Sequence, residues 1–268
     1  MAADQRGGAA GALLLRRLLT AGQDITFSDT ANPGVARMWQ TFGGYLDHAR
    51  ACDWMVVLRP GRWFGGLASG AIRRKDLGRG QIPVPALPFQ AMRRRSGRWA
   101  LPERDPEAIG EDVDAATIVE QLPEMSRGFR LRMDYEEDFL DHLFGQVESR
   151  FGKLERRIVR RDGRPIGWYA YLPDSRGVSR VMHLLAGGPD RDADAVLADL
   201  VAHAGEQGSA VIAGRHEPHL TQVLHRGLNP IFGFAQRPVV HCHAPELLAI
   251  LATSDSVLTR LDGEWFVI

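Results

Sequence analysis

Hydrophobic and polar residues recur with helical spacing at the start of the chain and then with strand spacing. Five leucines between Leu13 and Leu19 line one side of a helix and two arginines the other, so the spacing predicts an amphipathic helix over 10–20. Gly22 ends this helix, and the alternation around Ile25 and Phe27 predicts a strand. The opening segment is therefore an ordered helix followed by a strand.

The next elements carry their own start and stop signals. Asn32-Pro33 has the pattern of an N-cap followed by proline at the first helical position, and the apolar residues after it predict a second helix that ends at Gly43-Gly44. Residues 52–58 predict a buried strand, which Pro60 stops.

From residue 129 onward the same patterns recur. The spacing predicts a strand at 129–133, a helix at 136–151 with Phe139 on its buried side, and a hairpin of 154–161 and 165–172 around Asp162-Gly163. The remaining predicted elements are strands at 178–186, 210–213 and 231–243, helices at 192–207, 218–226 and 246–253, and a terminal hairpin at 258–267 around Asp262-Gly263.

Two parts of the chain repeat each other. The order helix, glycine, strand, helix, glycine, strand occurs over 10–59 and again over 192–243 at a nearly constant offset. We therefore predict three regions: 1–59 as the second half of a domain, 60–125 as a connector, and 126–268 as a complete domain.

The connector is rich in proline, glycine and sorted charge. Apart from a short amphipathic helix at 63–74, little regular structure is predicted there. Residues 73–98 hold eight basic residues against one acidic (net +7), and 103–124 hold eight acidic against one basic (net −7). Arg93, Arg94, Arg95, Arg98 and Trp99 could form a nucleic-acid arm, but the equal acidic block beside them argues against it.

Composition excludes several classes of protein. The net charge of zero is not that of a surface built for nucleic acid or anionic lipid. Cys52 and Cys242 form no CxxC pattern and are expected to be packing residues in a reducing compartment. No apolar run approaches the roughly 20 residues of a membrane span, so a cytoplasmic location is expected.

A small-residue segment at the start carries the first candidate chemistry. A turn that opens into the helix over 10–20 leaves N–H groups free at the positive end of the helix dipole, where a phosphate can sit. The pattern Gln5-x-x-Gly8-x-Ala10 resembles the Gln/Arg-x-x-Gly-x-Gly/Ala pattern of GNAT-superfamily N-acetyltransferases, and Asn32 followed by Gly43 resembles that family's next helix. The alternative is an alanine-rich helix start with no ligand.

The resemblance implies a fold, a cofactor and a reaction. The fold is α/β (α+β), a GNAT-like mixed sheet flanked by helices, with one complete copy and the C-terminal half of another, as in GNAT-like domains found in tandem in some bacterial proteins. The implied reaction is transfer of an acetyl group from acetyl-CoA to an amine. The residues implied to bind acetyl-CoA are Gln5, Arg6, Gly7, Gly8, Ala9, Ala10 and Gly11.

The first half of that opening domain is missing before Gln5. Without that half, the strands predicted within 1–59 would have an unpaired edge and too small an apolar core to fold alone. Either the chain belongs to a longer protein, or these elements add to its own second half, or a homodimer completes the half-domain.

The second copy has a different turn at the equivalent place. Asp190, Asp192 and Asp194 follow Gly187-Gly188-Pro189, and carboxylates there favour the helix through its dipole but repel an anion. We therefore predict that this copy keeps the fold without holding CoA in the usual way. Ala195 and Val201 occupy the glycine and glutamate positions of a calcium loop, so a helix cap is expected rather than calcium.

Candidate catalytic residues lie at strand ends. The family's tyrosine, seven residues after the asparagine, is replaced by Trp39, with Val223 near the equivalent place in the second copy, so Tyr45 is a candidate substitute or else an ordinary strand residue. Asp29 and Glu217 are candidate bases at the ends of equivalent strands. Glu217 could instead cap the helix that follows it.

Histidines next to these positions raise the question of a metal. His216 and His219 flank Glu217, and His241 and His243 share one face of a strand. No cysteine or carboxylate at ligand spacing completes a zinc set. Three hypotheses result: an acetyl-CoA-dependent N-acyltransferase, a catalytically inactive GNAT-like scaffold or regulatory module, and a nucleic-acid-associated protein.

Overall fold

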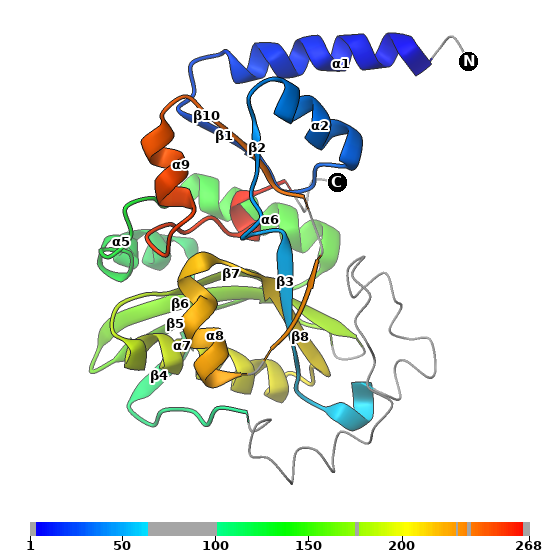
Figure 1. The fold of residues 1–268 in the computed structure, drawn as a ribbon. Coiled ribbons are helices and arrows are strands. Elements are labelled where there is room, and N and C mark those ends of the chain that lie inside the picture. Colours follow the sequence, from blue (N-terminus) through cyan, green and yellow to red (C-terminus); the bar gives the residue numbers. More distant parts are fainter. Residues whose placement is uncertain (1–3, 64–100, 175–176, 229, 235–236, 265–268) are drawn as a thin grey trace.

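The structure is a computed structural model that describes residues 4–63, 101–174, 177–228, 230–234 and 237–264 (Figure 1). The helices are α1 (Asp4–Leu19), α2 (Pro33–Thr41), α5 (Ala115–Met125), α6 (Glu137–Phe151), α7 (Asp190–Glu206), α8 (Thr221–Gly227) and α9 (Pro245–Leu251), with 3-10 helices η2 (Pro218–Leu220) and η3 (Arg260–Asp262). The strands are β1 (Ile25–Ser28), β2 (Tyr45–Leu46), β3 (Cys52–Val57), β4 (Ala108–Asp112), β5 (Glu155–Arg161), β6 (Arg164–Leu172), β7 (Val178–Ala186), β8 (Val211–Arg215), β9 (Ile231–Phe234) and β10 (Val239–Cys242). None of the described helices is both long and apolar enough to cross a bilayer.

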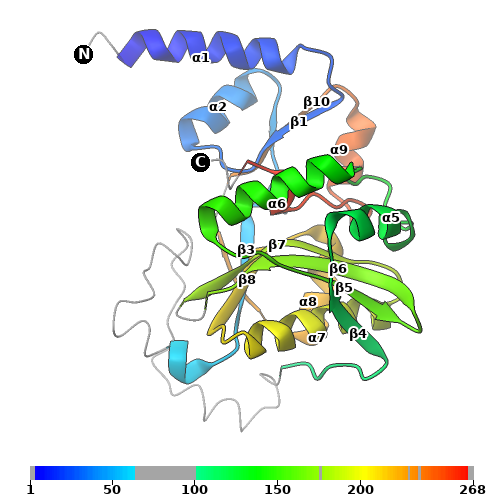
Figure 2. The same cartoon turned by 180° about the vertical axis from the view of Figure 1, so that it is seen from behind.

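The larger sheet has seven strands in the order β4-β5-β6-β7-β8-β3-β9. All neighbours run antiparallel except β7 and β8, which are parallel and joined by α7. Helices α5 and α6 cover one face, and α7 and α8 cover the other (Figure 2). Each face has its own apolar core, because successive side chains of a strand point to opposite faces: Trp168 belongs to the core under α6, and Tyr169 to the core under α7.

The predicted hairpin of β5 and β6 is confirmed. Asp162 and Gly163 form its two-residue turn with φ of 51° and 76°, the positive values that a type I′ turn requires. The N-cap at Asn32 is also confirmed, since its side chain accepts hydrogen bonds from the amides of Gly34 and Val35.

The smaller sheet joins the two ends of the chain. Its order is β1-β10-β2, so a strand from the second half lies between two strands from the first. The larger sheet shows the reciprocal arrangement, with β3 between β8 and β9. The elements of the opening segment therefore add to the second half of this chain, which is one of the three alternatives that the sequence left open.

The exchange follows the internal repeat. In the internal repeat, β1, β2 and β3 correspond to β8, β9 and β10. Replacing each strand of the order β1-β10-β2 by its counterpart gives β8-β3-β9, which is the order found in the larger sheet. Each repeat gives its last strand to the sheet of the other. The apolar strand β3 has Trp54, Met55 and Val56 buried, so it could not be left at an edge without exposing them.

Several local predictions are wrong. Residues 108–125 were expected to lack regular structure, but β4 pairs with β5 and α5 packs on the sheet. Residues 129–133 contribute only a bridge from Leu131 to Ser256. In the hairpin predicted at 258–267, Arg260–Asp262 form η3 instead of a strand, and residues 265–267 lie outside the described residues. Phe139 is 47% exposed rather than buried. The helix predicted at 63–74 and the basic block at 73–98 lie outside the described residues, apart from Trp63.

Candidate functional site

The candidate site lies where β7 and β8 separate. The two parallel strands pair only over Val178–Arg180 and Val211–Ala213, although β7 continues to Ala186 and β8 to Arg215. Beyond that point the gap between them must be filled by side chains. Such a divergence of strands is where ligands usually bind in α/β sheets.

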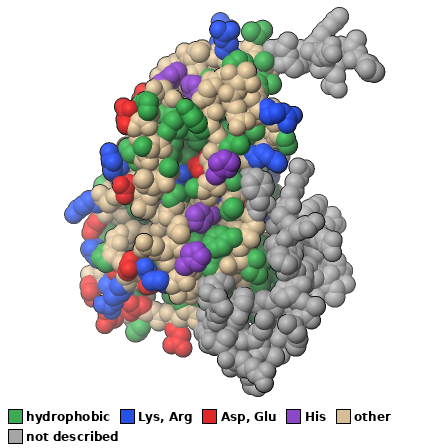
Figure 3. Space-filling view, viewed as in Figure 1, with side chains coloured by type: hydrophobic (Ala, Val, Ile, Leu, Met, Phe, Trp, Pro, Cys, Tyr) green, Lys and Arg blue, Asp and Glu red, His purple; other side chains and the backbone are tan. Residues whose placement is uncertain are grey.

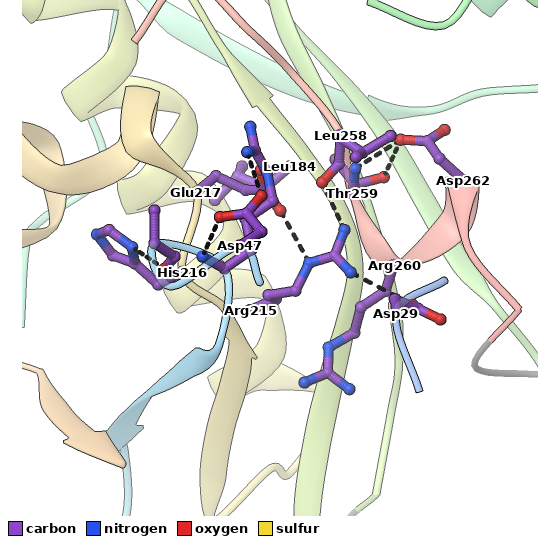
Figure 4. A network of polar contacts seen from close by, with 12 residues as sticks. Asp29, Asp47, Leu184, Arg215, His216, Glu217, Leu258, Thr259, Arg260 and Asp262 are labelled. Carbon is purple, nitrogen blue, oxygen red and sulfur yellow. Dashed lines mark hydrogen bonds and ion pairs between the residues drawn. The ribbon is translucent and has the colours of Figure 1, made fainter. Parts of the chain in front are cut away.

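A buried ionic network fills one side of this gap (Figure 4). Arg215 donates from Nε to Glu217 at 3.0 Å and from Nη1 to Asp29 at 3.3 Å, and its Nη2 donates to the carbonyl of Leu258. The side chains of these three charged residues are at most 3% exposed. Burial raises the pKa of Asp29, although Arg215 and Arg260 oppose the effect.

Arg50 joins this network to the rest of the molecule. Its Nε donates to the second oxygen of Glu217 at 2.6 Å, and its other nitrogens donate to Asp47, to the carbonyl of Leu251 and to Ser256. Glu217 is thus held by two arginines, one from the segment before β3 and one from β8. The prediction that its side chain caps the following helix is wrong, since it makes no capping hydrogen bond there.

A second polar group lies on the opposite side of the gap. Thr259 donates from its backbone and from its hydroxyl to Oδ2 of Asp262, at 2.6 and 2.9 Å, and Tyr135 donates to Oδ1. Nδ1 of His183 lies 3.0 Å from the Thr259 hydroxyl oxygen, and the imidazole stacks on Trp168 with centroids 3.8 Å apart. Burial lowers the pKa of His183 well below its usual range and raises that of Asp262 to about 6.

A cavity of about 10 Å³ remains between these two groups. It is lined by Trp54, residues 181–184, Arg215, Glu217, Leu220, Thr259 and Arg260. Trp54 reaches into the gap from the exchanged strand β3, donating from its indole to the carbonyl of Arg215 at 3.1 Å. A cavity of this size holds about one water molecule.

A larger groove of about 190 Å³ lies at the start of α7. Gly187, Gly188 and Pro189 form one wall, and the charged residues that line the groove are Arg127 and Arg164 together with Glu124 and Asp192. Gly188 has a φ of 83°, and a Cβ on Gly187 would lie 2.9 Å from the ring of Phe129. Gly188 therefore adopts a backbone conformation that favours glycine, and Gly187 allows the close packing of Phe129 against the turn.

Asp190 and Asp192 lie in the first turn of α7, where acidic residues were predicted, but the predicted side-chain cap is absent. Asp192 is buried and accepts from Arg161 and Arg164, each at 2.9 Å. Asp190 and Asp194 both pair with Arg226, and no side chain caps the helix. Each of the three carboxylates therefore has an arginine partner whose positive charge offsets its own.

The predicted cofactor turn at the start of the chain is not a turn. Residues 5–11 lie within α1, which begins at Asp4, so most of their amides face along the helix. Ala10 and Gly11 are exposed, and a Cβ added to Gly11 would meet nothing within 4 Å. In both views the start of α1 extends beyond the rest of the fold (Figures 1 and 2). The binding of acetyl-CoA by residues 5–11 stays a prediction.

The three predicted catalytic residues separate into two places. Asp29 and Glu217, which follow the equivalent strands β1 and β8, meet through Arg215. Tyr45 lies elsewhere, 55% exposed, beside a groove of about 470 Å³ between β2, β10 and α9. Figure 3 shows apolar side chains gathered over α9 at this surface. Trp39 and Val223, at the family's tyrosine positions, are both buried.

Sequence reasoning missed His183, Tyr135 and Asp262. His183 lies in a strand whose apolar residues indicated burial alone, and Asp262 was assigned to a turn because glycine follows it. Their roles depend on contacts across 76 and 127 sequence positions, which no local pattern encodes.

Metal ligands are not gathered anywhere in the described part of the chain. It holds no group of three or more His, Cys, Asp or Glu side chains placed to bind an ion. The rings of His241 and His243 lie 4.8 Å apart, and His243 faces the carbonyl of Leu19.

Comparisons with known proteins give similarity at the level of structure. No protein-family model and no curated protein sequence matches the chain. It is similar to a GCN5-related N-acetyltransferase from Anabaena variabilis ATCC 29413, at 9% identity and a TM-score of 0.49 over 90% of this chain and 52% of that one. A GCN5-related N-acetyltransferase from Kribbella flavida gives 15% identity and a TM-score of 0.47, over 90% and 49%. Saccharomyces cerevisiae N-myristoyltransferase with bound myristoyl-CoA gives 10% identity and a TM-score of 0.41, over 71% and 47%.

The chain spans about half the length of each of these three proteins. The class of fold itself follows from the topology: a mixed α/β fold in which a seven-stranded sheet has helices on both faces and one parallel pair joined through α7. Strands β5 to β9 of this sheet lie within residues 126–268, β4 comes from the region predicted as a connector, and β3 comes from the first half of the chain.

Proposed function

We propose that the chain is a GNAT-like acyltransferase that transfers an acyl group from acyl-CoA, with acetyl-CoA as the simplest donor, to an amine. The observation that carries the proposal is the groove at the start of α7, where two glycines meet Arg127 and Arg164. The groove lies next to the end of β7, and β7 also borders the gap between β7 and β8. One strand therefore runs past both the groove and the gap.

The groove has the features that a diphosphate needs. In the first turn of α7 the amide of Asp192 donates to the carbonyl of Pro189 at 2.9 Å, so the amides of Asp190 and Arg191 are the ones at this helix end that a diphosphate could use, and the helix dipole favours an anion there. Arg127 is exposed, and Arg164 keeps half of its side chain in solvent while pairing with Asp192. We therefore assign the diphosphate of acyl-CoA to the second copy rather than to Gln5–Gly11.

The chemistry would be direct transfer. An amine nitrogen attacks the thioester carbonyl carbon, the C–N bond forms as the C–S bond breaks, and the nitrogen gives up a proton. Neither copy has a tyrosine at the position of the family's general acid, so the enzyme relies on positioning and on polar groups near the gap.

Binding of acetyl-CoA tests the proposal. At 100 times the Kd, a ligand stabilises the fold by about 2.7 kcal/mol, which raises the melting temperature measurably. Arg127→Glu should abolish the shift, whereas Arg130→Glu, a charge reversal at a nearby exposed arginine outside the groove, should preserve it. If Arg6→Glu removes the shift instead, the first turn is the site and the assignment to α7 is wrong.

A non-catalytic scaffold is the second candidate, and one observation favours it. The gap between β7 and β8 is closed by the network of Arg50, Arg215 and Glu217, leaving about 10 Å³. A folded protein that shows neither a thermal shift with acetyl-CoA nor acylation of any amine in a broad panel would support this function. The third hypothesis rests on arginines that lie outside the described residues.

A further inference from the structure

His183 has a ring nitrogen with no partner in a buried place. The side chain is 3% exposed and lines the small cavity between β7 and β8. Nδ1 contacts Thr259, but Nε2 is buried and makes no hydrogen bond within the described part of the chain. Leaving a buried polar atom unsatisfied costs about 1–3 kcal/mol, a cost that an apolar side chain would avoid.

The hydrogen bonds around Thr259 determine which ring nitrogen holds the proton. The Thr259 hydroxyl has one hydrogen, which it donates to Asp262 at 2.9 Å, so its oxygen must accept from His183. Nδ1 of His183 therefore carries the proton, and Nε2 presents a lone pair. Tyr135 holds the other oxygen of Asp262 and fixes the end of this chain of hydrogen bonds.

The surroundings keep the imidazole neutral. Burial and the neighbouring imidazole of His219 both lower the pKa of His183. Arg215 and Arg260 also line the cavity, and Glu217, which is held by Arg50 and Arg215, is the carboxylate that faces it. The cavity volume of about 10 Å³ leaves room for one water molecule beside Nε2.

We propose that His183 is the proton acceptor of the acyl-transfer reaction, taking the proton of the acceptor amine at Nε2 through one water molecule, with Thr259 and Asp262 as positioning residues. The inference rests on the proposed function. As the amine nitrogen bonds to the carbonyl carbon, its proton passes to the water, and a proton of that water passes to Nε2. The C–S electron pair leaves with the thiolate, which takes a proton from solvent.

The first test does not depend on activity. Nitrogen-15 NMR of the full chain reports which imidazole nitrogen is protonated. We expect His183 in the Nδ1–H form, neutral from pH 8 to below its ordinary pKa, and we expect Thr259→Val to alter the tautomer ratio because it removes the acceptor. An Nε2–H form in the unmodified chain would overturn the inference, since no lone pair would face the cavity.

The second test measures acyl transfer from acetyl-CoA to a panel of amines. His183→Gln should reduce kcat by about 100-fold or more, as expected for loss of a general base, with little change in the acetyl-CoA thermal shift. The control is His142→Gln, an exposed histidine on α6. Thr259→Val should lower kcat less and shift the pH profile.

The two proposals fail in different ways. If the unmodified chain acylates an amine and His183→Gln does so equally well, the role of His183 is wrong and the proposed function stands. If the unmodified chain acylates no amine, the proposed function fails, and the catalytic role of His183 fails with it whatever tautomer NMR finds.

Discussion

At the scale of single residues, the most consequential feature is how the buried charges are paired. Glu217 and Asp29 were both predicted as bases, but each accepts a hydrogen bond from Arg215 in the interior. Both oxygens of each carboxylate already accept hydrogen bonds within the fold, those of Glu217 from Arg215 and Arg50 and those of Asp29 from Arg215 and the amide of Glu264, so neither is placed to collect a proton from a substrate. His183 instead keeps Nε2 without a hydrogen-bond partner beside the cavity, which is why the inferred base is a residue that the sequence did not single out.

Asp262 gives a pH-dependent prediction. Burial raises its pKa to about 6 from an ordinary value of 3.8, against the opposing hydrogen bond from Tyr135. The folded state therefore binds a proton more tightly than the unfolded state, so this residue stabilises the fold fully below pH 3.8 and loses that contribution as the pH rises through 6. The two pKa values correspond to about 3 kcal/mol of unfolding free energy.

The measurement is urea unfolding of the unmodified chain and of Asp262→Asn between pH 3.5 and 7. The unfolding free energy of the unmodified chain, minus that of the variant, should fall by about 3 kcal/mol across this range. Taking the difference removes the contributions of His183 and His219, whose pKa values are lowered and whose effect on stability has the opposite sign. A difference that is constant or rises with pH would contradict the assignment.

At the scale of elements, most structure follows local rules, and the turns show this best. Asp162-Gly163 closes the hairpin because both residues adopt positive φ, which glycine does without strain. Helix α1 shows the limit of such rules. Its pattern predicted an apolar side, and Leu19 is indeed buried, but Leu13 and Leu14 are 67% and 68% exposed. Amphipathic spacing predicts a helix but not what covers it.

A pair of glycine substitutions tests the turn. Gly163→Ala should destabilise the chain by about 1 kcal/mol, because alanine is strained at a φ of 76°. Gly145→Ala is the matched control in the interior of α6, where the added Cβ meets nothing within 4 Å, and it should stabilise the chain by about 0.5–1 kcal/mol. Equal effects of the same sign in chemical unfolding would argue against the type I′ turn.

At the scale of the whole molecule, the exchange of β3 and β10 makes the two halves interdependent. Without the first half, β8 and β9 would lose the strand between them, and Trp54 would leave the gap beside Gly214, which its ring contacts closely. Arg50 adds a polar connection, since it reaches Glu217, Leu251 and Ser256 from the segment before β3. The candidate site is thus built from both ends of the chain.

Cutting the chain tests this interdependence. A specific protease site inserted between residues 80 and 81 would produce fragments 1–80 and 81–268. We expect the two fragments to elute together in native gel filtration and to separate only in denaturant, because each holds a strand inside a sheet of the other. Fragments that separate under native conditions, with 81–268 still folded, would show that the exchange is dispensable.

The sequence by itself determined the positions of most helices and strands, the hairpin turn, the Asn32 cap and the internal repeat, because periodicity, caps and glycine conformations are local properties. It also pointed to Asp29 and Glu217, since strand ends can be read along the chain. Only the tertiary structure decided that these two meet through Arg215, that each repeat lends a strand to the other, that arginines neutralise the aspartates of α7, and that His183 keeps a free nitrogen beside a cavity. Each of these features depends on which segments distant in sequence pack together to bury their apolar side chains. Local sequence patterns do not specify those long-range contacts.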